Sequence, residues 1–157
     1  MDFNAKCTED LKTNIKIIDE QHKVYFKMLN ELLAFSLKGE ARSVISESIK
    51  MLSDYVIVHF STEESMMAEY HYPKYDSHRS AHRHFRREVE RMASLFKDNR
   101  DPTKNVILKY DYLLVTWFTN HIKEVDKKMS KFLLEKMEEE KSFIFRIKKF
   151  FGFGKKR

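Results

Sequence analysis

The chain has 157 residues, the size of one domain, and can bury about 70% of the surface that its unfolded form exposes. Glycine and proline together number 5, whereas average usage would give about 19, which argues against a turn-rich all-β fold. A single cysteine excludes an intrachain disulfide, and the first residues lack the basic-then-apolar layout of a secretory signal. From these two features we expect a cytoplasmic protein, and because no apolar run approaches the length of a membrane-spanning helix, we expect no segment to span the bilayer.

The formal net charge of +6 is concentrated at one end of the chain. Residues 141–157 carry seven Lys or Arg and no acidic residue. The remainder has 23 basic and 24 acidic residues, a net charge of −1. Because the body of the chain is nearly neutral, we expect no nucleic-acid partner.

Apolar residues recur at helical spacing in four segments, which we predict as helices: residues 19–38, 41–70, 75–97 and 101–137. Gly39 is placed to end the first helix, and Pro73 marks the turn after the second. The fourth helix is predicted to begin with Asp101 as its N-cap and Pro102 at its first position, and to end near Met137.

The connections between these segments are short, so neighbouring helices are expected to pack antiparallel. The sequence therefore predicts an all-α fold, an up-down-up-down four-helix bundle with a C-terminal basic amphipathic extension. We expect an N-terminal arm at 1–18, the bundle at 19–138 and the basic tail at 139–157.

Polar side chains interrupt the apolar faces at six positions: His22, His59, Glu63, His78, His82 and His121. Burying such a group without a partner costs about 2–7 kcal/mol. His59 and Glu63 are four residues apart, as are His78 and His82, so either pair could bind a metal or form a local hydrogen-bonded pair. Asp126 follows His121 by five residues, which places it about 140° around an α-helix from His121. Its carboxylate could extend back to the same metal, or it could be solvated, and the spacing fits both equally well.

All four predicted helices bring such side chains to one bundle interior, so a single shared site is more economical than four coincidences. The site would offer five imidazoles and two carboxylates, which is too many for one four-coordinate zinc. Iron, copper, nickel and zinc all accept these donors, and their number favours a dinuclear centre.

Four segments resemble the hemerythrins, particularly the single-domain bacteriohemerythrins: IDEQH at 18–22, HFSTEE at 59–64, HRSAH at 78–82 and WFTNHIKEVD at 117–126. The resemblance spans about residues 11–135 and fills all seven ligand positions of the family. No histidine has a glutamate three residues before it, which separates the chain from ferritin-like di-iron proteins.

The resemblance implies a non-heme di-iron centre with an oxo or hydroxo bridge. In it, one iron is bound by His78, His82 and His121, the other by His22 and His59, and both by Glu63 and Asp126. The second iron keeps an open position, where the family binds dioxygen. The implied function is reversible dioxygen binding by a carrier, store or sensor. The alternatives are a di-iron redox enzyme acting on peroxide, nitric oxide or ferrous iron, and a partner-dependent signalling module.

Apolar side chains flank the predicted ligands and are the expected wall of the oxygen pocket: Tyr25, Phe26, Leu29, Phe60, Met67, Trp117, Phe118 and Ile122. At helical spacing such a stripe also forms ordinary core, and the two roles are compatible. An apolar wall would exclude water and protons while admitting a small neutral gas.

Four other residues complete the expectations for the arm and the bundle. Members of the family commonly carry a glycine shortly before the first helix, where this chain has Asn14, which also tolerates a left-handed backbone. His71 and His84 lie off the metal-binding stripes and are expected to be exposed. Cys7 has no neighbouring metal-ligand spacing, so we assign it no role.

The tail reads KSFIFRIKKFFGFGKKR from residue 141. One helical face carries its apolar residues Phe143, Ile144, Ile147, Phe150 and Phe151, and the basic residues take other angles. This pattern favours binding at an anionic membrane interface, which would make the protein peripheral to the inner face of the membrane. The alternative is that the apolar face packs on the bundle or on a protein partner.

Overall fold

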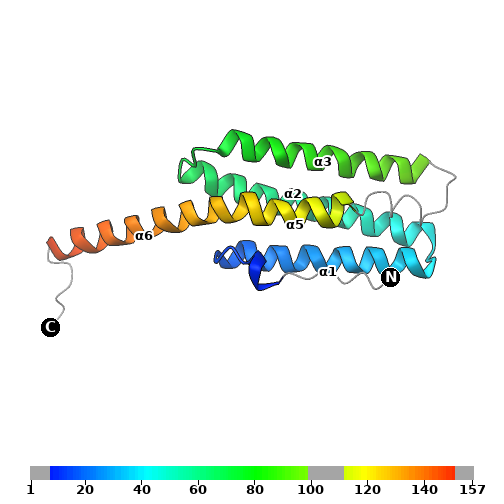
Figure 1. Ribbon diagram of the computed structural model, residues 1–157, viewed down its shortest axis with the longest axis horizontal. Helices are drawn as coiled ribbons and strands as arrows, with labels where there is room; N and C mark the ends of the chain where they lie inside the picture. The colour runs from blue at the N-terminus through cyan, green and yellow to red at the C-terminus, as the bar shows by residue number, and fades with distance from the viewer. Residues whose placement is uncertain (1–7, 99–111, 151–157) are drawn as a thin grey trace.

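A computed structural model describes residues 8–98 and 112–150, which form an antiparallel four-helix bundle (Figure 1). The elements in chain order are a 3₁₀ turn η1 (Glu9–Leu11), α1 (Lys16–Lys38), α2 (Arg42–Glu69), α3 (Tyr75–Asp98), η2 (Tyr112–Trp117), α5 (Phe118–His121), η3 (Ile122–Asp126) and α6 (Lys127–Phe150). The last four follow one another without a break and make the fourth rod of the bundle. The predicted all-α bundle is confirmed, and none of the described helices is long and apolar enough to cross a membrane.

Two left-handed residues fix the ends of α1. Gly39 has φ of +72° and directs its N–H to the carbonyls of Phe35 and Ser36, which ends the helix as predicted. Before the helix, Asn14 has φ of +65°, so the asparagine takes the left-handed conformation that its position requires. The Asp19 carboxylate accepts hydrogen bonds from the backbone N–H groups of Thr13 and Asn14, and this holds the arm against α1.

The fourth rod differs from its prediction in two ways. Both η2 and η3 are π-helical, whereas the sequence pattern predicts a regular α-helix. The rod also continues to Phe150, past the predicted end near Met137, because no glycine or proline interrupts the chain before Gly152. The predicted start at Asp101 and Pro102 lies outside the described residues.

The apolar core is divided into two clusters. The larger cluster holds most of the core, including Tyr25, Phe60, Phe85, Phe118 and Ile122. The smaller cluster consists of Ile15, Ile18, Met67, Tyr72, Met129 and Leu133. Each rod passes from one cluster to the other through a buried polar position, as Ile18, His22 and Tyr25 illustrate on α1. A layer of buried polar side chains therefore separates the two clusters.

Candidate metal centre

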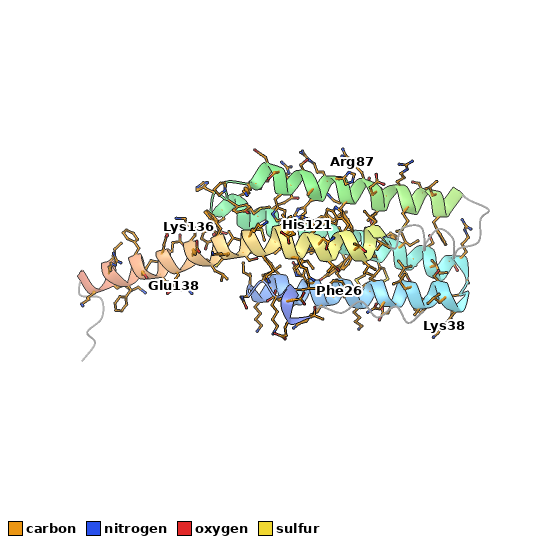
Figure 2. All side chains as sticks on the ribbon, in the orientation of Figure 1. Phe26, Lys38, Arg87, His121, Lys136 and Glu138 are labelled. Carbon is orange, nitrogen blue, oxygen red and sulfur yellow. The ribbon has the colours of Figure 1, made fainter. Side chains whose placement is uncertain are left out.

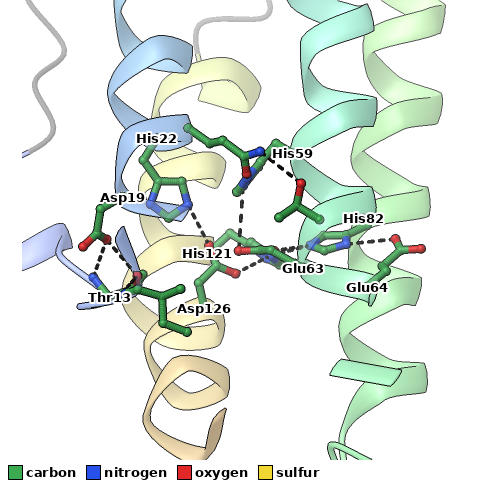
Figure 3. A network of polar contacts seen from close by, with 12 residues as sticks. Thr13, Asp19, His22, His59, Glu63, Glu64, His82, His121 and Asp126 are labelled. Carbon is green, nitrogen blue, oxygen red and sulfur yellow. Dashed lines mark hydrogen bonds and ion pairs between the residues drawn. The ribbon is translucent and has the colours of Figure 1, made fainter. Parts of the chain in front are cut away.

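The polar layer contains all seven residues that the sequence singles out, and each is at most 4% exposed. They come from every rod of the bundle: His22 from α1, His59 and Glu63 from α2, His78 and His82 from α3, His121 from α5 and Asp126 from η3. Figure 3 shows the labelled members of this set pointing toward one another in the bundle interior. Four helix faces that are separate in the sequence thus meet at one place.

The π-helical turn η3 explains how Asp126 joins the group. In an α-helix, a residue five positions after His121 would lie about 140° away from it. A π-helix closes its hydrogen bonds between residues five apart, which stacks such residues on one face. As a result, His121 Nε2 lies 3.0 Å from Asp126 Oδ1, and the carboxylate is fully buried rather than solvated.

His78, His82 and His121, the three-histidine group, converge through their Nε2 atoms. The Nε2 atom of His121 lies 3.2 Å from those of both His78 and His82. Nitrogen ligands about 2.1 Å from one metal ion lie about 3.0–3.4 Å from one another at right or tetrahedral angles. The spacing of the three nitrogens therefore suits a common ion.

His22 and His59, the two-histidine group, lie on the other side of the carboxylates, with ring centroids 4.8 Å apart. Glu63 directs Oε2 toward His82 Nε2 at 3.2 Å and Oε1 toward His59 Nε2 at 3.9 Å. Asp126 directs Oδ1 toward His121 and Oδ2 toward His22 Nε2 at 3.4 Å. Each carboxylate thus offers one oxygen to each histidine group.

A metal would satisfy buried atoms that have no hydrogen-bond partner within the described protein. These atoms include Nε2 of His22 and His59 and both carboxylate oxygens of Glu63 and Asp126. Leaving so many polar atoms unpaired in a dry interior is costly, and native proteins rarely do it. Two sets of donors are close enough to hold an ion: Glu63, His78, His82, His121 and Asp126 in one, and His22, His59, Glu63 and Asp126 in the other.

The electrostatics of the cluster keep the carboxylates charged. Burial and the Asp126 charge act to raise the pKa of Glu63, but the facing imidazoles outweigh them and hold it below its usual value. Burial also acts to raise the pKa of Asp126, and the imidazoles, led by His121, lower it well below its usual range. Burial lowers the pKa of His59 from 6.5 to about 4, which favours the neutral imidazole that binds metals.

Two further side chains orient the imidazoles from outside the cluster. The Nδ1 atom of His59 lies 3.1 Å from Gln21 Oε1, and Nδ1 of His82 lies 3.0 Å from Glu64 Oε1. Each contact suits an Nδ1–H donor and leaves Nε2 as the ligand atom. Sequence spacing did not predict these roles, although each residue directly adjoins a predicted ligand in the chain.

Aromatic rings pack on both histidine groups. Phe60 stacks on His82 with centroids 3.8 Å apart, and Trp117 stacks on His121 at 4.6 Å. Phe118 instead faces the two-histidine group, with its centroid 5.9 Å from that of His22 and 5.8 Å from that of His59. Among the described residues, aromatic carbon therefore forms much of the surroundings of both groups.

The structure separates one predicted wall residue from the others. Tyr25, Phe26, Leu29, Phe60, Phe118 and Ile122 belong to the larger cluster, and Trp117 packs against it. Met67 belongs to the smaller cluster, because its place one turn beyond Glu63 carries it to the opposite side of the polar layer. His71 and His84 are exposed, as predicted.

Comparisons with known proteins agree with this geometry. Residues 13–133 match the model of the hemerythrin HHE cation binding domain. The chain is 34% identical over 118 residues to a bacteriohemerythrin of Pseudomonas paraeruginosa, covering 75% of this chain and 74% of that protein. It is 33% identical to a bacteriohemerythrin of Methylococcus capsulatus, covering 73% and 85% of the two chains. A crystal structure of wild-type hemerythrin matches with a TM-score of 0.68 and 29% identity, covering 77% of this chain and 90% of that one.

Proposed function

Because this chain belongs to the hemerythrin family, we propose that its polar layer holds two iron ions and binds dioxygen reversibly. The observation that carries the proposal is the division of the cluster into three and two histidines that share both carboxylates. In this proposal the three-histidine group and the two-histidine group each bind one ion, and Glu63 and Asp126 bridge the pair.

The unequal division supports a vacant coordination position. With one bridging oxygen from solvent, the ion at the three-histidine group would have six ligands, whereas the ion at the two-histidine group would have five. Two ferrous ions held by the two histidine groups and the shared carboxylates would supply the two electrons that dioxygen takes up on binding and gives back on release. The predicted place for the gas is thus beside His22 and His59.

The side chains around that position support reversible binding. Phe118 packs against both His22 and His59 and stacks on Tyr25 with centroids 3.7 Å apart. The Tyr25 hydroxyl donates a hydrogen bond to the Leu114 carbonyl at 2.7 Å, so the stacked pair is fixed in place. This buried apolar wall excludes water and protons, which would otherwise promote irreversible oxidation of the iron.

We infer a binding protein, acting as a carrier, a local store or a sensor, rather than an enzyme. The described part of the site offers a buried cluster and an apolar wall, and both suit the uptake of a small neutral molecule. The single cysteine fits our prediction of a cytoplasmic protein.

The test is an absorption spectrum recorded after reduction without air, after exposure to dioxygen and again after purging, with iron measured on the same sample. We expect about two irons per chain and a visible charge-transfer band that appears with dioxygen and fades on purging. The His22→Ala variant should lack the band. A band that never reverses, together with turnover of peroxide or nitric oxide, would favour the redox enzyme, and absence of iron would refute the site.

A further inference from the structure

The end of α6 extends beyond the bundle. In Figure 1 the helix continues past the turn between α2 and α3, and Figure 2 places Lys136 and Glu138 where it leaves the other helices. Among the described residues, the last hydrogen bond to the bundle runs from the Tyr70 hydroxyl to Glu140 Oε2 at 3.5 Å. We call residues 141–150 the α6 extension.

The α6 extension exposes large apolar side chains. Phe143 is 63% exposed, Ile144 48% and Ile147 39%, and at 100° per residue these three share one face. Phe145, on the opposite side, is 68% exposed. Single apolar residues are common on surfaces, but a contiguous apolar face on a projecting helix indicates a binding surface.

Positive charge surrounds this apolar face. Arg146, Lys148 and Lys149 form no ion pair with the described part of the chain, and Lys141 pairs only with Glu138 of its own helix, at 3.5 Å. No acidic residue follows Glu140 in the sequence. A matching surface must therefore be apolar and negatively charged at the same time.

Of the surfaces that could cover the extension, an anionic bilayer satisfies both requirements. Two copies of the extension packed face to face would bring their lysines and arginines together, and like charges at an interface are costly. In a bilayer, the apolar face enters the boundary between headgroups and acyl chains, while the long basic side chains reach back to lipid phosphates. In the structure the extension runs on past the end of the bundle (Figure 1), so the bundle does not cover it.

We propose that the α6 extension binds the surface of an anionic lipid bilayer, with Phe143, Ile144 and Ile147 inserted at the interface. The bundle is then held at the membrane by one helical arm. This binding does not depend on iron or dioxygen, so it can fail while the proposed metal function stands.

The experiment is sedimentation of the full chain with vesicles of phosphatidylcholine, either pure or containing phosphatidylglycerol. We expect binding only to the anionic vesicles, weakened as salt is raised from about 0.1 M to about 1 M. The paired change Lys148→Glu and Lys149→Glu should weaken binding at least about 25-fold, since each basic residue contributes about fivefold. The paired change Phe143→Ser and Ile147→Ser should weaken it at least about tenfold.

Matched controls alter the bundle instead of the extension. Arg83→Glu with Arg87→Glu changes net charge equally on exposed α3 positions, and Ile17→Ser with Ile57→Ser removes two apolar side chains that are 54% and 42% exposed. Both controls should bind anionic vesicles like the parent chain. Equal binding by the extension variants, or no binding by the parent, would overturn the proposal. So would a concentration-dependent dimer, measured by sedimentation velocity without lipid, that only the extension variants abolish.

Discussion

Aromatic rings pack differently against the two histidine groups of the buried site. On the three-histidine side, Phe60 and Trp117 lie face to face with imidazoles, with interplanar angles of 5° and 12°. On the two-histidine side, the Phe118 ring meets the imidazoles at 89° and 53°. Stacked and edge-to-face contacts are both favourable arrangements of aromatic rings, so both sides are packed, but in different ways. The two sides thus differ in ring orientation: stacked rings cover imidazoles of the side with three histidines, and edge-on or tilted contacts border the side with two, where dioxygen is proposed to bind.

Removing a shared carboxylate should have the largest effect, because it acts on both sides at once. We expect Glu63→Gln to reduce iron content from about two ions per chain to well below one, since an amide is a weak ligand and loses the charge. His59→Ala should instead leave about one iron, held by the three-histidine group. Metal analysis of both variants, with helical content checked by circular dichroism, makes the comparison. Equal iron in the two variants would contradict the shared role of Glu63.

Truncating Phe118 should weaken the fold and open the two-histidine side. The ring is fully buried, so Phe118→Ala should lower the free energy of unfolding of the metal-free protein by about 3–5 kcal/mol in urea titrations. Val58→Ala, at a residue that is 55% exposed, should change it by less than about 0.5 kcal/mol. The reduced Phe118→Ala protein should also oxidise irreversibly faster than the parent in air. An unchanged rate would mean that the ring does not protect the site.

The two histidine groups should change the stability of the metal-free protein in opposite directions as the pH changes. Burial lowers the pKa of His59 from 6.5 to about 4, so the unfolded chain binds more protons and stability falls by about 3 kcal/mol as pH drops across that range. Burial also acts to lower the pKa of His78, but Asp126 and Glu63 outweigh it and raise it to about 9. The stability from His78 is therefore complete below pH 6.5 and is lost as pH rises through 9.

Urea unfolding at these pH values measures both effects. The His59→Gln variant should lose less stability than the parent between pH 6.5 and 4, and His78→Gln should lose less between pH 6.5 and 9. Identical pH profiles for the parent and both variants would contradict the assignment.

The smallest effect on metal binding is expected from replacing the side chains that orient the imidazoles. Gln21→Leu removes the contact to His59 Nδ1, and Glu64→Leu removes the contact to His82 Nδ1. Losing such a partner typically costs 10–100-fold in metal affinity. The first variant should weaken binding only of the ion at the two-histidine group, and the second should weaken binding only of the ion at the three-histidine group. Competition with a chelator, followed by metal analysis, separates the two, and equal loss of both ions would refute the division.

The sequence was sufficient to predict the bundle because each helix carries its own apolar stripe. Gly39 ends α1 as expected, and the buried faces of α1 and α3 follow the predicted spacing. The π-helical turn was missed because helical periodicity assumes regular turns. The five-residue spacing of His121 and Asp126 was its one visible signal.

Other details depend on tertiary packing and have weak sequence signals. Met67 lies at helical spacing from Glu63, like the predicted wall residues, and only the bundle shows on which side of the polar layer it packs. Gln21 and Glu64 look like solvated polar residues until the partner helices bring His59 and His82 beside them. Sequence spacing predicts which faces meet, but not which atoms touch.

The most direct test of the proposed centre is a crystal structure of the iron-loaded protein with anomalous diffraction measured at the iron edge. We predict two iron peaks about 3.5 Å apart, one beside Nε2 of His78, His82 and His121 and one beside Nε2 of His22 and His59. Glu63 and Asp126 should each contact both peaks. A single peak, or two peaks that do not share the carboxylates, would contradict the account.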